Sequence, residues 1–472
     1  MTAKRIPIAV LGAGPAGLGA AYRLARRESF AVTVIERGPT VGGNAGSFEL
    51  AGLRVDYGSH RLHPSCAPEI LQDIRGILGD ALLDRPRHGR IRLRGHWVHF
   101  PLKPADLATH LPPSFLAGVA LDSLGKVASR APGDTFAAVL RQGLGRTICN
   151  DFYFPYARKI WGVDPELLDA EQARRRVAAG SLLKMARKIL NAVPGLKKKG
   201  SGRFFYPREG YGAISEAYGK SAAAAGARFL FKTSIAAIEA AGGSVRAVHT
   251  SGPEGSGRLE VRQALSSIPV SQLARLLQPA PPEAVQKAAC ALQFRAMILI
   301  YLVLETDRFT EFDAHYFPDA EIQITRLSEP KNYGLAGKPG RTDLCAELPC
   351  SVEDAVWRAS DQELQELVLR ALERAGIPVR CAVSEAASRK LPQAYPIYTR
   401  QYRESFDLLD GWLSGIDGLV TFGRQGLFAH DNTHHALAMA YALDGCLRDD
   451  GSLDRDAWAA CRRDFEKHVV ED

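Results

Sequence analysis

A glycine-rich turn between an apolar strand and an alanine-rich helix constrains this chain more than any other feature. Residues 6–11 are apolar, and the glycines that follow have the spacing Gly-x-Gly-x-x-Gly. The first glycine allows a tight turn, the second lets the backbone approach a pyrophosphate, and the third lets helix and strand pack closely. This context predicts a Rossmann-like dinucleotide site rather than an ordinary glycine turn. Its predicted contacts are Gly12, Gly14, Pro15, Ala16 and Gly17.

An acidic residue follows at the distance that such a site requires. Glu36 comes directly after the expected strand 31–35, where a carboxylate can bind ribose hydroxyls. A glycine doublet comes next, and Arg37, Gly43 and Asn44 are further cofactor-binding candidates. This continuation resembles the second part of the FAD fingerprint of the amine oxidase superfamily. The resemblance implies FAD, because a plain nicotinamide dehydrogenase has no need of the doublet.

A second strand, glycine turn and helix occupy residues 421–443. The positive end of the expected helix, 436–447, would stabilise negative charge at the flavin pyrimidine edge. Surface capping by Asp431 or Asn432 is the simpler alternative, but it explains a single residue of the polar run. No cysteine occurs between 423 and 434, so we expect non-covalent FAD. The candidates here are Gly423, Arg424, Asn432, Thr433 and His434.

Length and composition indicate a multidomain globular protein. The 472 residues exceed the roughly 250–300 at which a single core stops growing. The net charge of +8 favours an anionic partner, and without a nucleic-acid motif we expect a small molecule. The eight cysteines form no C-x-x-C and no metal-like cluster, which predicts free thiols, no metal site and a cytoplasmic location.

The middle of the chain should interrupt the nucleotide-binding fold. Residues 91–101 alternate like a β-hairpin around Gly95, and 104–200 are mostly helical in pattern. Within that insert, 182–200 has the pattern of a basic amphipathic helix. Such a helix either contacts an anionic membrane surface, placing the protein at the inner face of a membrane, or packs on the core with a solvated far side.

Over nearly its whole length the chain resembles UDP-galactopyranose mutase and the protoporphyrinogen-oxidase-like flavoproteins. The order and spacing of the matching segments carry the resemblance, since most of them are weak alone. Besides the N-terminal fingerprint, these segments are His60 to His63, 159–167, 206–211, 324–333, 395–397 and 423–434.

The resemblance implies substrate-binding residues. In the mutases, arginines of the substrate-domain sheet hold a sugar-nucleotide diphosphate, and Arg295 and Arg326 match them here. Tyr395 matches a tyrosine that meets the diphosphate. Guanidinium groups suit phosphate because they bind it bidentately while staying charged. For Arg295 the alternative is a structural salt bridge inside the sheet.

Two histidines of the loop 56–63 are candidates for proton transfer, since imidazole titrates near neutrality. In the resembling family this loop lies beside the flavin, where the histidine mainly positions other groups. We therefore expect positioning or packing for His60 and His63, with proton transfer as the alternative. The loop also adds Gly58, Ser59 and His60 to the cofactor-binding set, and the expected strand 235–239 adds Ile235.

Three functions stay open at this stage. The first is an FAD-dependent oxidoreductase that transfers hydride from an anionic, phosphate-bearing substrate, a nucleotide-linked or lipid-linked sugar, to flavin N5. The second is a mutase-like isomerase in which reduced N5 attacks a sugar nucleotide. The third is a flavin-binding scaffold without turnover. The larger helical insert and the run 429–434, which lacks the mutase Asp-Met-Asp, favour the oxidoreductase.

The predicted fold class is mixed α/β. A Rossmann-like FAD-binding domain is interwoven with a mixed-sheet substrate domain and a helical insert. We expect the FAD-binding domain in three parts, 1–90, 206–288 and 411–472. The substrate-domain hairpin and helical insert should occupy 91–205, and the substrate-domain sheet 289–410.

Overall fold

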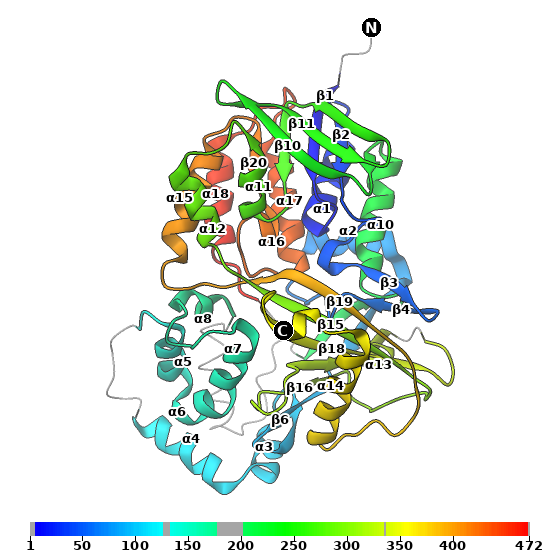
Figure 1. The fold of residues 1–472 in the computed structure, drawn as a ribbon, viewed down its shortest axis with the longest axis vertical. Coiled ribbons are helices and arrows are strands. Elements are labelled where there is room, and N and C mark those ends of the chain that lie inside the picture. Colours follow the sequence, from blue (N-terminus) through cyan, green and yellow to red (C-terminus); the bar gives the residue numbers. More distant parts are fainter. Residues whose placement is uncertain (1–4, 126–132, 177–201, 335–336, 471–472) are drawn as a thin grey trace.

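The computed structural model describes residues 5–125, 133–176, 202–334 and 337–470. Within these residues the chain forms two halves, one above the other in Figure 1. The upper half contains the N-terminal strand and the C-terminal helices. The lower half contains a large mixed sheet and most of the helical insert. The predicted basic helix at 182–200 lies outside the described residues.

The upper half is built on a five-stranded parallel sheet with the order β20-β13-β1-β2-β9. The glycine turn follows the central strand, at the carboxyl edge where strand order reverses and ligands bind in open α/β sheets. The strands are β1 (Ile6–Leu11), β2 (Phe30–Ile35), β9 (Arg228–Leu230), β13 (Gln263–Ser266) and β20 (Leu419–Thr421).

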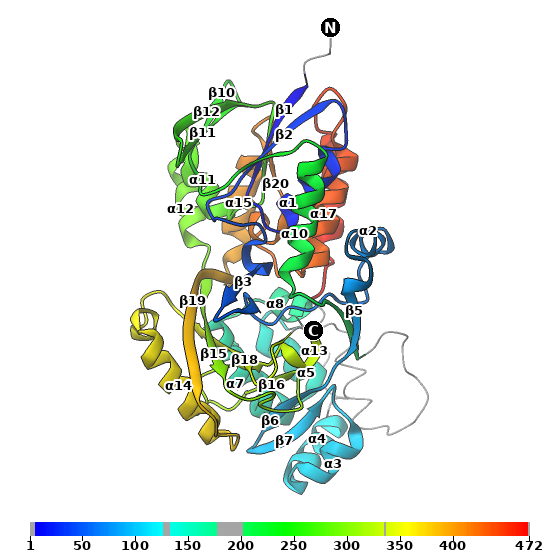
Figure 2. The same ribbon diagram turned by 90° about the vertical axis from the view of Figure 1, so that its right-hand side faces the viewer.

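Helices cover one face of this sheet, and Figure 2 shows α1, α10 and α17 beside one another. A Cβ added at Gly19 of α1 would lie 2.9 Å from Ala440 of α17, so the two helices approach closely. The helices on this side are α1 (Pro15–Leu24), α2 (Pro68–Leu78), α10 (Gly212–Ala224), α17 (Thr433–Cys446) and α18 (Arg455–Phe465).

The other face carries a small second sheet with the order β12-β11-β10-β14 and three helices. Its strands are β10 (Ser234–Ala241), β11 (Ser244–Gly252), β12 (Gly255–Glu260) and β14 (Leu277–Gln278), and its helices α11 (Val270–Leu276), α12 (Glu283–Ala291) and α15 (Tyr402–Ser414). The predicted boundary at 410 falls inside α15. Its apolar side packs in the upper half, so the return of the chain begins earlier than expected.

The lower half contains a seven-stranded sheet with the order β19-β15-β18-β17-β16-β6-β7. Its strand β15 is buried along nearly its whole length, and α14 (Asp361–Arg374) covers one face of the sheet. The predicted hairpin at 91–101 is confirmed. The strands are β6 (Gly89–Leu93), β7 (His96–Phe100), β15 (Phe294–Leu304), β16 (Ala314–Tyr316), β17 (Arg326–Ser328), β18 (Thr342–Cys350) and β19 (Val383–Pro396).

The described part of the insert is helical, as predicted, and forms its own apolar cluster against β6 and β7. A π-helical turn at Cys149–Tyr153 joins α6 to α7, and such turns recur at functional sites. The helices are α3 (Pro104–His110), α4 (Pro113–Gly125), α5 (Phe136–Leu144), α6 (Arg146–Ile148), α7 (Phe154–Trp161) and α8 (Ala170–Arg176).

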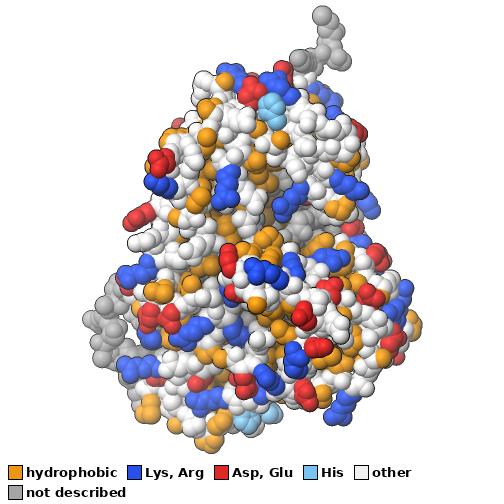
Figure 3. Space-filling view, viewed as in Figure 1, with side chains coloured by type: hydrophobic (Ala, Val, Ile, Leu, Met, Phe, Trp, Pro, Cys, Tyr) orange, Lys and Arg blue, Asp and Glu red, His pale blue; other side chains and the backbone are white. Residues whose placement is uncertain are grey.

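Short ribbons connect the halves. They are β3 (Ser47–Leu50) with β4 (Leu53–Asp56), and β5 (Leu82–Pro86) with β8 (Arg203–Pro207). Among the described residues no helix is long and apolar enough to span a membrane. All eight cysteines are free thiols. On the face in Figure 3, basic and acidic side chains are interspersed, so the positive excess forms no single large patch there.

Candidate active site

One continuous cavity of about 1470 Å³ runs from the glycine turn to the helical insert. Its volume exceeds the roughly 300–1,000 Å³ of a usual small-molecule site, so it has room for a cofactor and a second molecule. The predicted site residues that line it are Gly12, Gly14, Pro15, Ala16, Glu36, Arg37, Gly43, Asn44, Ser59, His60, His63, Ile235, Arg326, Tyr395, Arg424, Asn432 and Thr433.

Four predicted cofactor residues lie behind the cavity wall instead. A Cβ at Gly17 would come within 2.0 Å of the Gly12 carbonyl oxygen, so this glycine serves helix packing. Gly423 packs on α1 in the same way, because its Cβ would lie 2.6 Å from the Cβ of Ala16. Gly58 adjoins the core of the lower sheet, and His434 is buried beside His435.

Arg295 does not reach the cavity either. Its guanidinium donates to the Ser351 hydroxyl at 2.9 Å and to the Pro349 carbonyl at 3.4 Å. The sheet register places Arg295 opposite Tyr395, but the two side chains have separate surroundings. The contacts are structural hydrogen bonds rather than the alternative salt bridge, and they differ from the substrate contact that we expected.

The dinucleotide end of the cavity is formed mainly by backbone. One carboxylate oxygen of Glu36 accepts from the Ala13 N–H at 2.8 Å, and the other from the Gly38 N–H at 2.7 Å. A Cβ added at Gly14 would meet nothing within 4 Å. The turn therefore leaves open the space that a pyrophosphate needs, and the residues present fit a dinucleotide.

The N-terminus of α17 faces the same cavity from the opposite end of the chain. Asn432 is its N-cap residue, and the Asn432 N–H donates to Nδ1 of His435 at 3.2 Å. Arg424 lies beside this terminus, and its guanidinium donates to the Ala394 carbonyl at 2.7 Å. The helix dipole and this arginine both favour negative charge here, as a reduced flavin requires.

His60 is held in place by two contacts. Its Nε2 lies 2.8 Å from the Tyr57 carbonyl oxygen, and its ring stacks on Tyr211 with centroids 5.2 Å apart. Because the carbonyl only accepts, Nε2 carries the hydrogen. Burial lowers the pKa of His60, so its ring is neutral near pH 7. For His63, Nδ1 accepts from the Ser65 N–H at 3.1 Å.

Arg326 is paired inside the cavity wall. Its Nη2 lies 2.6 Å from Oε1 of Glu347, and the same oxygen accepts from the Ser59 N–H at 3.1 Å. Burial alone would lower the pKa of Arg326, but the Glu347 carboxylate and nearby tyrosine hydroxyls together raise this pKa well above the ordinary value. The pair thus joins the lower sheet to the histidine loop.

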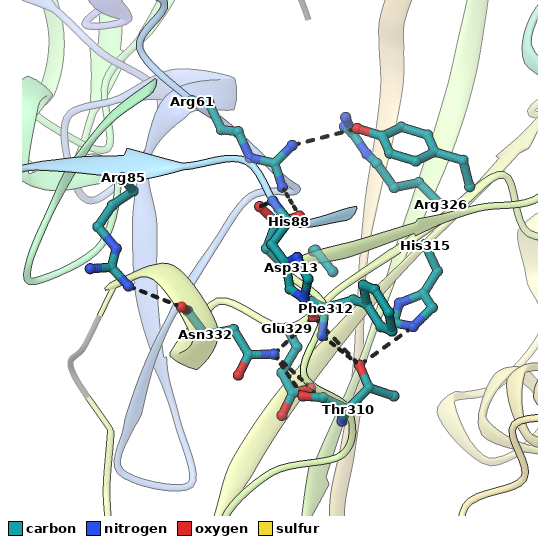
Figure 4. A network of polar contacts seen from close by, with 12 residues as sticks. Arg61, Arg85, His88, Thr310, Phe312, Asp313, His315, Arg326, Glu329 and Asn332 are labelled. Atoms are coloured by element: carbon teal, nitrogen blue, oxygen red, sulfur yellow. Dashed lines mark hydrogen bonds and ion pairs between the residues drawn. The ribbon is translucent and has the colours of Figure 1, made fainter. Parts of the chain in front are cut away.

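A neighbouring ion pair was not predicted. Arg61 pairs with Asp313 at 3.2 Å, and its guanidinium donates to the Tyr316 hydroxyl at 3.4 Å, next to Arg326 (Figure 4). Asp313 also accepts from the His88 N–H at 3.0 Å. Arg61 belongs to the predicted histidine loop, 56–63. No sequence pattern distinguishes an arginine that is buried from one that is solvated.

Two arginines approach the ring of Tyr395. The guanidinium carbons of Arg176 and Arg424 are each 5.0 Å from the ring centroid. Arg176 ends α8 in a run of three arginines, of which only this one lines the cavity. Arg176 was not predicted, because the run alone does not show which of its arginines faces inward.

One cluster bears on the expectation that no metal is bound. Candidate ligand atoms of Asp431, His435 and His468 all lie within 4.8 Å of one another. Oδ1 of Asp431 is 3.4 Å from Nδ1 of His435 and 3.3 Å from Nδ1 of His468. The stacked rings of the two histidines, 4.3 Å apart, suit a polar Asp–His cluster as well as a metal, so the expectation stays a prediction.

A model of the flavin-containing amine oxidoreductase family matches residues 15–425. The chain therefore belongs to this family and is a flavoenzyme. The cavity joins the glycine turn, which fits a dinucleotide, to the N-terminus of α17, which favours negative charge.

Two curated proteins match short stretches of the chain. The chain is 40% identical over 80 residues to phytoene dehydrogenase of Streptomyces griseus, which is 16% of this chain and 15% of the relative. It is 46% identical over 61 residues to polyamine oxidase 1 of Oryza sativa subsp. japonica, 12% of either chain. These matches span a small part of the relatives and leave the substrate open.

Solved structures share the fold over nearly the whole chain. Reduced UDP-galactopyranose mutase has a TM-score of 0.77 and 19% identity, with 93% of both chains covered. A protein assigned as protoporphyrinogen oxidase from Exiguobacterium sp. 255-15 has a TM-score of 0.73 and 18% identity, covering 94% and 98%. Cyclohexylamine oxidase from Brevibacterium oxydans has 0.61 and 15%, covering 98% and 100%. At such identities the likeness shows the fold alone.

Proposed function

We propose that this flavoenzyme binds FAD non-covalently and oxidises an anionic substrate by hydride transfer. Bound FAD would supply the hydride acceptor, N5. The protein would hold the pyrophosphate at the glycine turn, the ribose at Glu36 and the flavin near α17. The described lining residues include no cysteine, which supports a non-covalent cofactor. The free thiols support a cytoplasmic location.

The charge of the cavity carries the proposal of an anionic substrate. Among the described lining residues, seven arginines and one lysine face three carboxylates. Two of these carboxylates are already engaged, Glu36 by backbone N–H groups and Glu347 by Arg326. A cationic amine substrate would meet repulsion here, whereas an oxyanion would find guanidinium donors.

The experiment is anaerobic stopped-flow of the purified holoenzyme, following the oxidised flavin band at about 450 nm. The substrates are nucleotide sugars, polyprenyl-linked sugars, amines and porphyrinogens. Bleaching by an anionic substrate supports the proposal, and bleaching by a neutral or cationic amine alone contradicts the anionic assignment. A Gly14→Ala variant, expected to lack FAD, is the flavin-free control.

The second candidate is a mutase-like isomerase, and one observation favours it. Arg326 and Tyr395, which the resemblance assigns to a diphosphate, both line the cavity. This function requires reduced flavin but no net oxidation. Isomerisation of a nucleotide sugar by dithionite-reduced enzyme, without bleaching of the oxidised form by any substrate, would establish it in place of the oxidoreductase.

A further inference from the structure

The side chains that the helical insert and the β6–β7 hairpin contribute to the cavity are apolar, and we call the space that they line the apolar chamber. Sixteen described lining residues lie between 91 and 161, and none of them carries a charge. Their polar side-chain atoms are confined to Tyr153, Tyr156 and Trp161. Apolar residues that line the chamber include Phe100, Leu107, Phe115, Phe136, Phe152 and Ile160.

This lining selects against a nucleotide. A base and a ribose lose hydrogen bonds to water when they enter a site with few donors and acceptors, at a cost of roughly 1–3 kcal/mol for each unpaired group. A hydrocarbon chain gains about 25 cal/mol per Å² of apolar surface that it buries. The apolar chamber therefore favours an aliphatic group over a nucleoside.

An oxyanion seat adjoins the apolar chamber, consisting of Arg176, Tyr395 and Arg424. The hydrogen bonds of Arg424 go to the carbonyl oxygens of Ala394, at 2.7 Å, and Asp431, at 3.5 Å. In the described part of the chain, neither arginine has a carboxylate at ion-pair distance, unlike Arg61 and Arg326. Burial lowers the pKa of Arg424, and the charge of Arg176 adds to this effect. A bound anion would relieve both arginines.

The oxyanion seat and the apolar chamber are continuous. The guanidinium carbon of Arg176 lies 5.9 Å from the ring of Trp161, a chamber residue, and 5.0 Å from the ring of Tyr395. Arg176 thus marks the boundary between charge and hydrocarbon. A ligand that fills both parts must be an amphiphile.

We propose that the substrate is an anionic amphiphile, with an oxyanion head between Arg176 and Arg424 at Tyr395 and a hydrocarbon tail in the apolar chamber. This inference rests on the proposed function and chooses lipid-linked over nucleotide-linked substrates. A lipid phosphate and a fatty carboxylate share the required chemistry.

The test measures equilibrium binding to the FAD-loaded full chain of farnesyl phosphate, oleate, farnesol, UDP and inorganic phosphate. Farnesyl phosphate or oleate should bind at least about tenfold more tightly than farnesol or UDP, because head and tail both contribute. Preference for the phosphate or the carboxylate identifies the head group, and either preference supports the proposal. UDP, inorganic phosphate or farnesol binding as tightly as both amphiphiles overturns it.

Matched variants separate the two contacts. Arg176→Met should weaken binding of the anionic amphiphile about tenfold and leave farnesol unchanged, whereas Phe152→Glu should weaken both. Arg174→Met, on the exposed side of the same helix, and Leu167→Glu, at a residue 58% exposed on the insert, are the controls. If Arg176→Met and Arg174→Met bind the anionic amphiphile with equal affinity, the assigned oxyanion seat is wrong. This comparison does not depend on whether Phe152→Glu folds.

Flavin content distinguishes failure of this inference from failure of the proposed function. A chain that purifies without FAD, and takes none up, contradicts the proposed function. A chain that holds FAD and is bleached by a nucleotide sugar, but binds no amphiphile, retains the proposed function and overturns the inference.

Discussion

The dinucleotide end of the cavity and the apolar chamber are built by different means. At the dinucleotide end, backbone N–H groups, glycines and a helix terminus form the wall, so a few local residues define it. In the apolar chamber, side chains from a hairpin and from several helices of the insert line the wall. Single substitutions should therefore abolish binding at the dinucleotide end, whereas the apolar chamber should tolerate most conservative substitutions.

The largest effect is expected where the two halves meet, at the buried ion pair of Arg326 and Glu347. Arg326→Met should lower the free energy of unfolding by about 3–5 kcal/mol, because it leaves Glu347 charged and buried. Adding Glu347→Gln should recover part of this loss. Urea unfolding of the holoenzyme measures both. Arg370→Met, at an exposed pair with Glu366, is the control and should cost less than about 1 kcal/mol.

Two glycines of the same turn should fail in different ways. Gly17→Ala should cost about 3 kcal/mol of unfolding free energy, because its Cβ meets a backbone oxygen that cannot yield. Gly14→Ala should stay within about 0.5–1 kcal/mol of the parent apoprotein but lose most of its FAD affinity, because its Cβ enters the pyrophosphate space. FAD titration and thermal unfolding separate the two. Equal FAD loss without loss of stability in Gly17→Ala would contradict this division.

Asp343, a buried carboxyl group of the lower sheet, allows the pH dependence of stability to be tested. Burial raises the pKa of Asp343 to about 7, against about 3.9 in an unfolded chain. Its contribution to stability is thus complete below pH 4 and is lost as the pH rises through 7. From pH 4 to pH 8, Asp343→Asn should gain on the order of 2 kcal/mol relative to the parent. Asp407→Asn, at an exposed side chain, should show no such trend.

The smallest effect is expected at the histidine loop. His60→Phe keeps the stack on Tyr211 but loses the hydrogen bond to the Tyr57 carbonyl, which should cost about 1 kcal/mol. Because burial lowers the pKa of His60, the ring is neutral at and above pH 7, and the pH profile of flavin reduction between 7 and 8 should not change. Stopped-flow at several pH values measures this. Loss of a titration step near neutrality would support the alternative, proton transfer by His60.

Sequence reasoning succeeded where a function depends on local backbone. The strand, glycine turn and helix at 6–24, Glu36 after its strand, and the N-terminus of α17 are all formed by residues close in the chain. The start of α17 at Thr433 rather than 436 is a small correction, because the polar first turn is already helical. Arg326 and Tyr395, which the resemblance assigned to a diphosphate, both line the cavity, and the diphosphate contact stays a prediction.

Prediction from the sequence failed where one residue type can occupy several different environments. Arg295 and Arg326 both belong to the lower sheet, yet one bonds Ser351 and the other lines the cavity. Within the arginine run of α8, two side chains pair with Glu171, one of them exposed and one buried, and the third reaches Tyr395. A difference of one residue turns a helical side chain by about 100°, so packing against distant strands decides the outcome.

The sequence by itself thus determined the flavin-type nucleotide fold, because glycine spacing and an acidic residue restrict backbone conformation within about forty residues. Only the tertiary structure decided which arginines face the cavity and which are neutralised by carboxylates, and it alone joined the insert to the β6–β7 hairpin as an apolar chamber. These properties arise from contacts between segments far apart in the chain, and side-chain direction, burial and charge pairing exist only once those segments have packed.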